Sequence, residues 1–74
     1  MPKKRIQTHK APAAIGPYSQ GIVAGNLVFV SGQLPAHPET GELVLDSIES
    51  ATHQVMKNLS AVLQAGGSSL EQVV

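Results

Sequence analysis

The sequence of 74 residues contains no cysteine and no tryptophan, and only one tyrosine and one phenylalanine. Without cysteine, the chain can form neither a disulfide nor a thiolate metal site. Two aromatic side chains are too few to build the stacking surface on which many proteins bind single-stranded RNA or DNA. A domain this small therefore depends on close packing or on oligomerisation for its stability.

Charged residues are also scarce, and they are unevenly placed. They make up 14% of the sequence, their formal charges sum to zero, and residues 11–38 carry none. The adjacent basic residues of 3–5 are too few for strong binding to phosphates, so we do not expect a nucleic-acid partner. All five acids lie at or after Glu39. The high apolar content, 42%, argues against a disordered chain and suggests apolar surface for partner subunits.

Long hydrophobic runs are absent as well. The longest run in the uncharged region, Leu27–Val30, is far shorter than the ~20 residues that a transmembrane helix needs. The basic N-terminus is not followed by the apolar segment of a secretory signal. We therefore expect a cytoplasmic protein that does not span a membrane.

A β-hairpin is predicted around Gly25-Asn26. This pair is typical of tight two-residue turns, and it separates two runs rich in strand-forming residues, 19–24 and 27–32. Pairing about the turn sets Ile22 opposite Phe29. Apolar residues fill both faces near the turn, which predicts that both faces of the hairpin are covered.

The same hairpin brings two polar clusters, 16–20 and 31–33, to one corner of the predicted sheet. At this corner Tyr18 offers a ring and a phenol, Ser31 a hydroxyl, and Gly32 an unobstructed backbone N–H group. Such groups suit an oxyanion or a carboxylate ligand. The alternative is that these hydroxyls satisfy neighbouring backbone groups and bind nothing.

One long helix is predicted over 47–65. Asp46 is expected to cap it, with Glu49 three residues later as in a capping box, and Gly66-Gly67 to end it. Its apolar stripe is expected to face the core. The stripe consists of Ile48, Ala51, Val55, Met56, Leu59, Val62 and Leu63.

Shorter strands are expected over 5–8 and 42–45, and Val73-Val74 has the composition of a strand beginning. Ending on β-branched apolar residues is unusual for a natural terminus. This pattern predicts that residues 1–74 are one domain truncated at its C-terminal end.

Other chemistries are poorly supported. His9, His37 and His53 lack the spacing of metal ligands, so no metal site is expected. Ser31, His37 and Asp46 are the residue types of a Ser-His-Asp catalytic triad. However, Ser31 lies in Val-Ser-Gly-Gln and not in a Gly-x-Ser-x-Gly elbow, which argues against a hydrolytic serine.

The motifs do resemble those of a known family. Residues 11–21 (Ala-Pro-Ala-Ala-Ile-Gly-Pro-Tyr-Ser-Gln-Gly) are similar to the N-terminal motif of the reactive intermediate deaminase family, also called Rid, YjgF or L-PSP. The likeness continues through 30–35, 40–44, the helix stretch 51–59 and the segment 65–74. It covers nearly the whole chain in the same order.

The resemblance implies an α+β fold like that of chorismate mutase, with a mixed sheet and helices on one face. The hairpin, the short strands and the long helix would be its N-terminal portion. It also implies a homotrimer with sites between subunits. The implied activity is the hydrolysis of 2-imino acids and their enamine tautomers, such as 2-aminoacrylate, to 2-keto acids and ammonia, without a cofactor.

The resemblance also assigns residues. Tyr18, Ser31 and Gly32 match positions that line the family's ligand cleft, where they would hold a small 2-imino acid. The family's carboxylate-binding arginine and water-orienting glutamate would lie beyond Val74, and neither Arg5 nor Glu71 matches them. We therefore assign no catalytic residue in this chain and expect it to be inactive alone. The alternatives are a non-catalytic module that binds small ligands or a protein, and an endoribonuclease or translation inhibitor.

Overall fold

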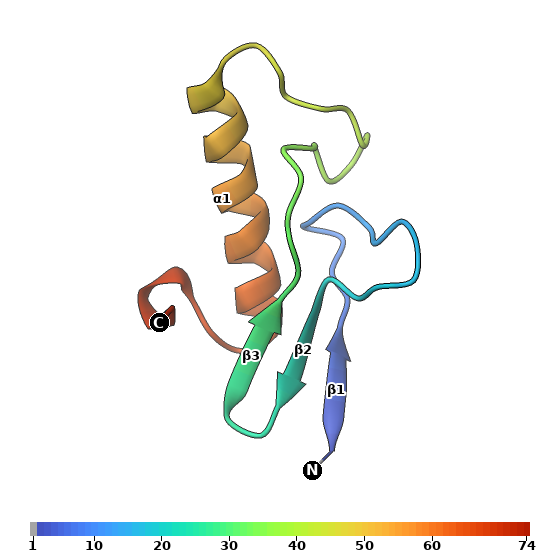
Figure 1. The fold of residues 1–74 in the computed structure, drawn as a ribbon, viewed down its shortest axis with the longest axis vertical. Coiled ribbons are helices and arrows are strands. Elements are labelled where there is room, and N and C mark those ends of the chain that lie inside the picture. The colour runs from blue at the N-terminus through green and yellow to red at the C-terminus, as the bar shows by residue number, and fades with distance from the viewer. Residues whose placement is uncertain (1) are drawn as a thin grey trace.

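A computed structural model describes residues 2–74, which form an antiparallel three-stranded sheet and one long helix (Figure 1). The sheet has the order β1-β2-β3. The predicted α+β arrangement of a hairpin, short strands and a long helix is confirmed. In chain order the elements are β1 (Lys3–Ile6), β2 (Gly21–Ala24), β3 (Leu27–Val30), α1 (Ile48–Ala65) and a short 3-10 helix, η1 (Leu70–Gln72).

The hairpin has the predicted turn and the predicted register. Ile22 pairs with Phe29, and Gly25 has a φ of 61°, a conformation that glycine adopts without a steric penalty. Both strands are shorter than predicted, ending at 21 and 30 on the side away from the turn. One more bond continues the pairing, since the Ser31 N–H donates to the Gln20 carbonyl at 3.1 Å.

The first strand lies two residues earlier than predicted, at Lys3–Ile6. Its pairing with β2 ends where Ile6 lies opposite Gly21. Beyond this pair, the Thr8 N–H donates to the Gln20 side chain and not to the backbone of β2. The strand predicted over 42–45 is reduced to a single bridge between Ala36 and Leu43. Residues 73–74 follow η1 and belong to no strand among the described residues.

Both ends of α1 are capped, but the N-terminal cap is not the predicted one. Ser47, rather than Asp46, is the N-cap: its backbone is extended, and its hydroxyl accepts the Ser50 N–H at 3.0 Å. At the other end Gly67 has a φ of 84°, and the Ser68 N–H donates to the Leu63 carbonyl at 2.8 Å. This bond is typical of a Schellman motif, which confirms the predicted glycine stop.

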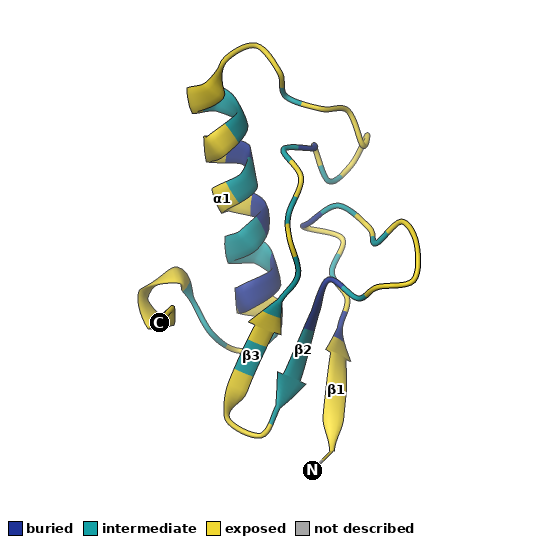
Figure 2. Ribbon diagram, in the orientation of Figure 1, coloured by how far each residue is buried: buried dark blue, intermediate teal, exposed yellow. Residues whose placement is uncertain are grey.

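The small core lies where the C-terminal half of α1 meets the sheet (Figure 2). Ile6, Ala11 and Val62 are buried there, and partly buried apolar side chains of the sheet pack around them. The helix approaches closely at Gly21, where an added Cβ would lie 3.0 Å from Val62 Cγ1 and 2.9 Å from the Phe29 carbonyl oxygen. Glycine at this position therefore lets the helix lie directly against the sheet.

The middle of α1 buries the amides Gln54 and Asn58, while Ala51, Val55 and Leu59 of the predicted apolar stripe are partly buried. Val62 and Leu63 are buried as predicted, whereas Ile48 and Met56 are exposed. Asn58, only 1% exposed, donates from Nδ2 to the carbonyls of Leu34 and Ala36, both at 2.9 Å. The stripe is therefore confirmed in part, and the buried amides were not predicted because the irregular segment 33–36 contacts this part of α1. Its carbonyls require hydrogen-bond donors.

The outer face of the hairpin is exposed, contrary to the prediction that both faces are covered. Leu27 and Phe29 are 55% and 58% exposed, on the side opposite the core residues Val23 and Val28. Within residues 2–74, only the face toward α1 is covered. No helix of the described residues is long and apolar enough to cross a membrane.

Candidate functional site

The two polar clusters meet at one corner, as the hairpin predicts. The Ser31 hydroxyl donates to the Ser19 carbonyl at 2.8 Å and lies 3.1 Å from the Gln20 carbonyl. These contacts connect Ser31 directly to residues 19–20, beyond Gly21 and Val30, the last pair of the β2–β3 ladder. They also occupy the hydroxyl hydrogen, so Ser31 keeps only its oxygen lone pairs for a ligand.

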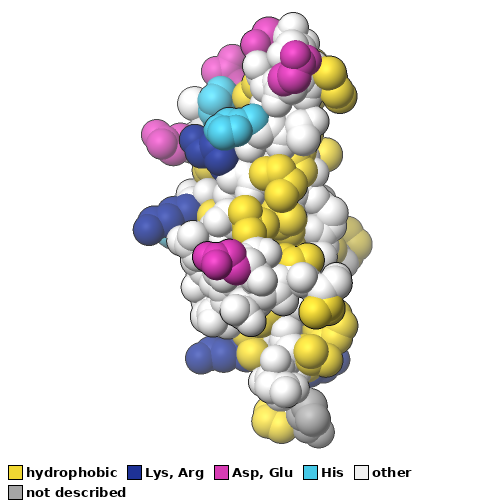
Figure 3. All heavy atoms as spheres, turned by 90° about the vertical axis from the view of Figure 1, so that its left-hand side faces the viewer, with side chains coloured by type: hydrophobic (Ala, Val, Ile, Leu, Met, Phe, Trp, Pro, Cys, Tyr) yellow, Lys and Arg dark blue, Asp and Glu magenta, His cyan; other side chains and the backbone are white. Residues whose placement is uncertain are grey.

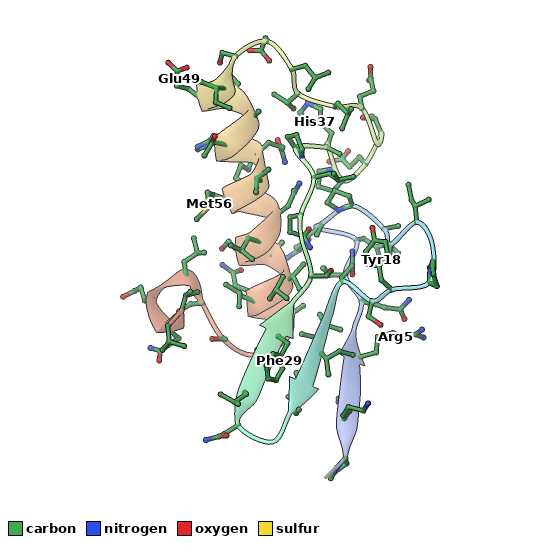
Figure 4. All side chains as sticks on the ribbon, in the orientation of Figure 1. Arg5, Tyr18, Phe29, His37, Glu49 and Met56 are labelled. Carbon is green, nitrogen blue, oxygen red and sulfur yellow. The ribbon has the colours of Figure 1, made fainter. Side chains whose placement is uncertain are left out.

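Tyr18 lies on the loop that leads into β2, on the same side of the molecule as Arg5 (Figure 4). Its side chain is 46% exposed, and its phenol oxygen accepts the Ile15 N–H at 3.3 Å. The loop turns tightly at Gly16, whose φ is 116°, and the Tyr18 N–H donates to the Gly16 carbonyl at 2.9 Å. Because the phenol acts only as an acceptor here, its own hydrogen is free to donate to a ligand.

An open hollow of about 410 Å³ lies beside Tyr18. Arg5, His9, Ser19 and Gln20 are among its lining residues, but Ser31 and Gly32 are not. Gly32 is exposed, with no atom within 4 Å of where a Cβ would be. The structure therefore joins the Ser31 and Tyr18 segments at one corner, while the three predicted ligand residues do not line one enclosed cavity in a single chain.

Gln20, which sequence reasoning did not assign, holds this corner together. It is 4% exposed, and its Oε1 accepts the Thr8 N–H at 2.7 Å. Its Nε2 faces three carbonyls, of which that of Pro12 is the nearest, at 2.7 Å. One side chain thus fixes segment 8–12 against the start of β2. Its place between Ser19 and Gly21 in the sequence carries no pattern that would have indicated this role.

The hollow beside Tyr18 contains a cationic side chain and hydrogen-bond donors, but it contains no carboxylate that could act as a base. Arg5 lines it, whereas none of the acids does. Among residues 2–74 there is also no group of three His, Cys, Asp or Glu side chains close enough to hold a metal ion. The described residues can therefore bind and orient an anion, but they provide no carboxylate there to activate water.

Comparison with known families agrees with the sequence motifs. A family model described as Endoribonuclease L-PSP matches residues 8–74. The chain belongs to the L-PSP family. The L-PSP chain is 53% identical over 72 residues to Reactive Intermediate Deaminase A, chloroplastic, of Arabidopsis thaliana, covering 97% of this chain and 38% of that protein. It is 42% identical over 71 residues to the 2-iminobutanoate/2-iminopropanoate deaminase of Escherichia coli K12, covering 96% and 55%.

A solved structure has the same fold. The L-PSP chain superposes on the crystal structure of RidA from the Antarctic bacterium Psychrobacter with a TM-score of 0.91 and 48% sequence identity. The match covers 96% of this chain and 57% of the other. The L-PSP chain thus spans between 38% and 57% of the length of these relatives. Their shared fold supports the resemblance on which Tyr18, Ser31 and Gly32 are assigned.

Proposed function

We propose that this L-PSP chain provides part of the substrate site of an enamine/imine deaminase. In the proposed reaction, water adds to the C=N carbon of a small 2-imino acid. The C–N bond then breaks, and a 2-keto acid and ammonia leave without a cofactor. The observation that carries this proposal is the 42% identity, over 96% of the chain, to a protein named 2-iminobutanoate/2-iminopropanoate deaminase.

Each of the three proposed ligand residues has a chemically suitable free group. Gly32 leaves its backbone unobstructed, and Tyr18 retains a phenol hydrogen that can donate to a carboxylate. Ser31 offers an acceptor oxygen, because its hydrogen is already donated. In this role the Ser31 oxygen accepts a hydrogen bond from the imine N–H and so helps to place the substrate.

Binding can be tested apart from catalysis. We expect 2-oxobutanoate, the keto-acid product, to shift the amide resonances of Ser31 and Gly32 when it is titrated into the 74-residue chain. Tyr18→Phe should weaken that binding about tenfold, as expected for one hydrogen bond to a charged group. The control Ser60→Ala, which removes a hydroxyl on α1, should leave it unchanged. Shifts confined to other parts of the chain would contradict the site.

Turnover by the chain alone is a separate question. We propose that it releases no ammonia from freshly generated 2-aminoacrylate above the uncatalysed rate. The support is the composition of the hollow beside Tyr18, whose lining includes no carboxylate to orient water. Activity near that of the E. coli relative would overturn this statement without affecting the binding site.

We also propose that the chain associates as a homotrimer in the cytoplasm, with its sites between subunits. The exposed apolar pair Leu27 and Phe29 on the outer face of the sheet supports association, because removing apolar side chains from water against a partner is favourable. The cytoplasmic location rests on the sequence alone, and cell fractionation would test it.

Cleavage of RNA is the second candidate, favoured by the family model's description, Endoribonuclease L-PSP. A formal net charge of zero and two aromatic residues argue against an RNA-binding surface. Salt-dependent binding of RNA at micromolar protein would favour this candidate over the deaminase.

A further inference from the structure

The three histidines of the chain, far apart in the sequence, line one open groove. His53 lies on α1, His9 on the loop after β1, and His37 on the loop before α1. The groove has a volume of about 720 Å³, within the range of small-molecule sites. It adjoins the hollow beside Tyr18, with which it shares His9, but neither Tyr18 nor Ser31 nor Gly32 lines it.

Positive charge exceeds negative charge in this groove. The titratable and charged residues that line it come from three segments. They are His9 and Lys10 from the first loop, His37 and Glu39 from the second, and His53 and Lys57 from α1. Two lysines therefore face one acid.

The arrangement can be followed on the surface of the molecule. Figure 3 shows histidine side chains gathered with Lys or Arg side chains on the upper part of this face, bordered by acids and apolar patches. Apolar side chains, Met56 and Leu70 among them, also line the groove. A ligand that fits it would thus carry both negative charge and an apolar part.

A metal ion does not suit the same residues. Among the described residues, no three His, Cys, Asp or Glu side chains are close enough to share an ion. Lysine is no ligand for a divalent cation, but it is a common phosphate ligand. Basic side chains from three separate segments line the groove, so an anion with several charged oxygens suits it better than a metal ion does.

We propose that this groove binds a small organic phosphate with more than one negative charge, at a site that neither Tyr18 nor Ser31 nor Gly32 lines. Lys10 and Lys57 support binding, and Glu39 opposes it.

The test titrates inorganic pyrophosphate into the full 74-residue chain near pH 6 while the resonances of the histidine rings are recorded. Saturable shifts at all three rings are the expected result. The double variant Lys10→Gln/Lys57→Gln should weaken binding on the order of tenfold, because two exposed charges are lost. The matched control Lys3→Gln/Lys4→Gln removes the same charge from β1, outside the groove, and should change it less than twofold.

Two results would each overturn the proposal: no shift of the histidine rings in the unaltered chain, or equal weakening by the two double variants. The first of these does not depend on any variant folding.

Discussion

At the scale of single residues, buried amides hold the irregular segments of this chain to its regular elements. Gln20 fixes 8–12, and Asn58 fixes 34–36. Gln54 supports Asn58 by donating to its Oδ1 at 3.0 Å. Within the described residues, no buried side-chain nitrogen or oxygen lacks a hydrogen-bond partner. Such satisfied contacts give loops a single arrangement, because the alternative is an unpaired buried polar group.

Gln20→Leu should lower the free energy of unfolding by about 2–3 kcal/mol, since the apolar side chain keeps the volume but leaves the Thr8 N–H and nearby carbonyls unpaired. Urea unfolding followed by circular dichroism measures the change. Gln7→Leu, at an exposed position, serves as the control and should change the stability by less than about 0.5 kcal/mol. Equal stability of both variants would show that the Gln20 bonds are not needed.

At the scale of elements, the hairpin register and the C-terminal end of α1 were predicted correctly, because glycines in the local sequence determine both. The Gly25-Asn26 turn set the hairpin register, and the glycines at 66–67 set the end of α1. The bounds of β1 were predicted wrongly, and the amides buried in the middle of α1 were not predicted. Both depend on contacts with distant segments, through Gln20 and Asn58, and helical periodicity contains no information about those partners.

The N-cap of α1 provides a test at this scale, because the sequence predicted Asp46 as the cap and the structure has Ser47 there. Ser47→Ala should destabilise the chain by about 1 kcal/mol, as expected for the loss of an N-cap hydroxyl. Asp46→Ala should cost less than about 0.5 kcal/mol, because this exposed residue lies outside the cap. Thermal unfolding of both variants under the same conditions checks the order. The reverse order would restore Asp46 as the cap.

At the scale of the whole molecule, the candidate site was predictable only in part. The hairpin brings segments 18–20 and 31–32 together, so the corner follows from one turn. The hydrogen bonds that determine which groups of Tyr18 and Ser31 remain free depend on side-chain geometry that the sequence does not contain. The groove of three histidines was not predicted either, because it requires the placement of two loops on α1.

Association should depend on the outer face of the sheet. If the proposed trimer uses this face, Phe29→Glu should shift the mass measured by light scattering toward that of a monomer, because it places a charge in an apolar contact. Met56→Glu, which adds the same charge at another exposed apolar position on α1, should leave the mass unchanged. A monomeric unaltered chain at tens of micromolar, or equal effects of both variants, would contradict the proposal.

The central claim is that this chain can serve as the matching part of an imine deaminase, and a chimera tests it most directly. The 71 aligned residues of the E. coli deaminase are replaced by this chain, and ammonia release from 2-aminoacrylate is measured. We expect kcat/KM within about tenfold of the parent enzyme, and a further loss of about tenfold for Tyr18→Phe in the chimera. A chimera that folds and assembles like its parent, yet releases ammonia only at the uncatalysed rate, would contradict the account.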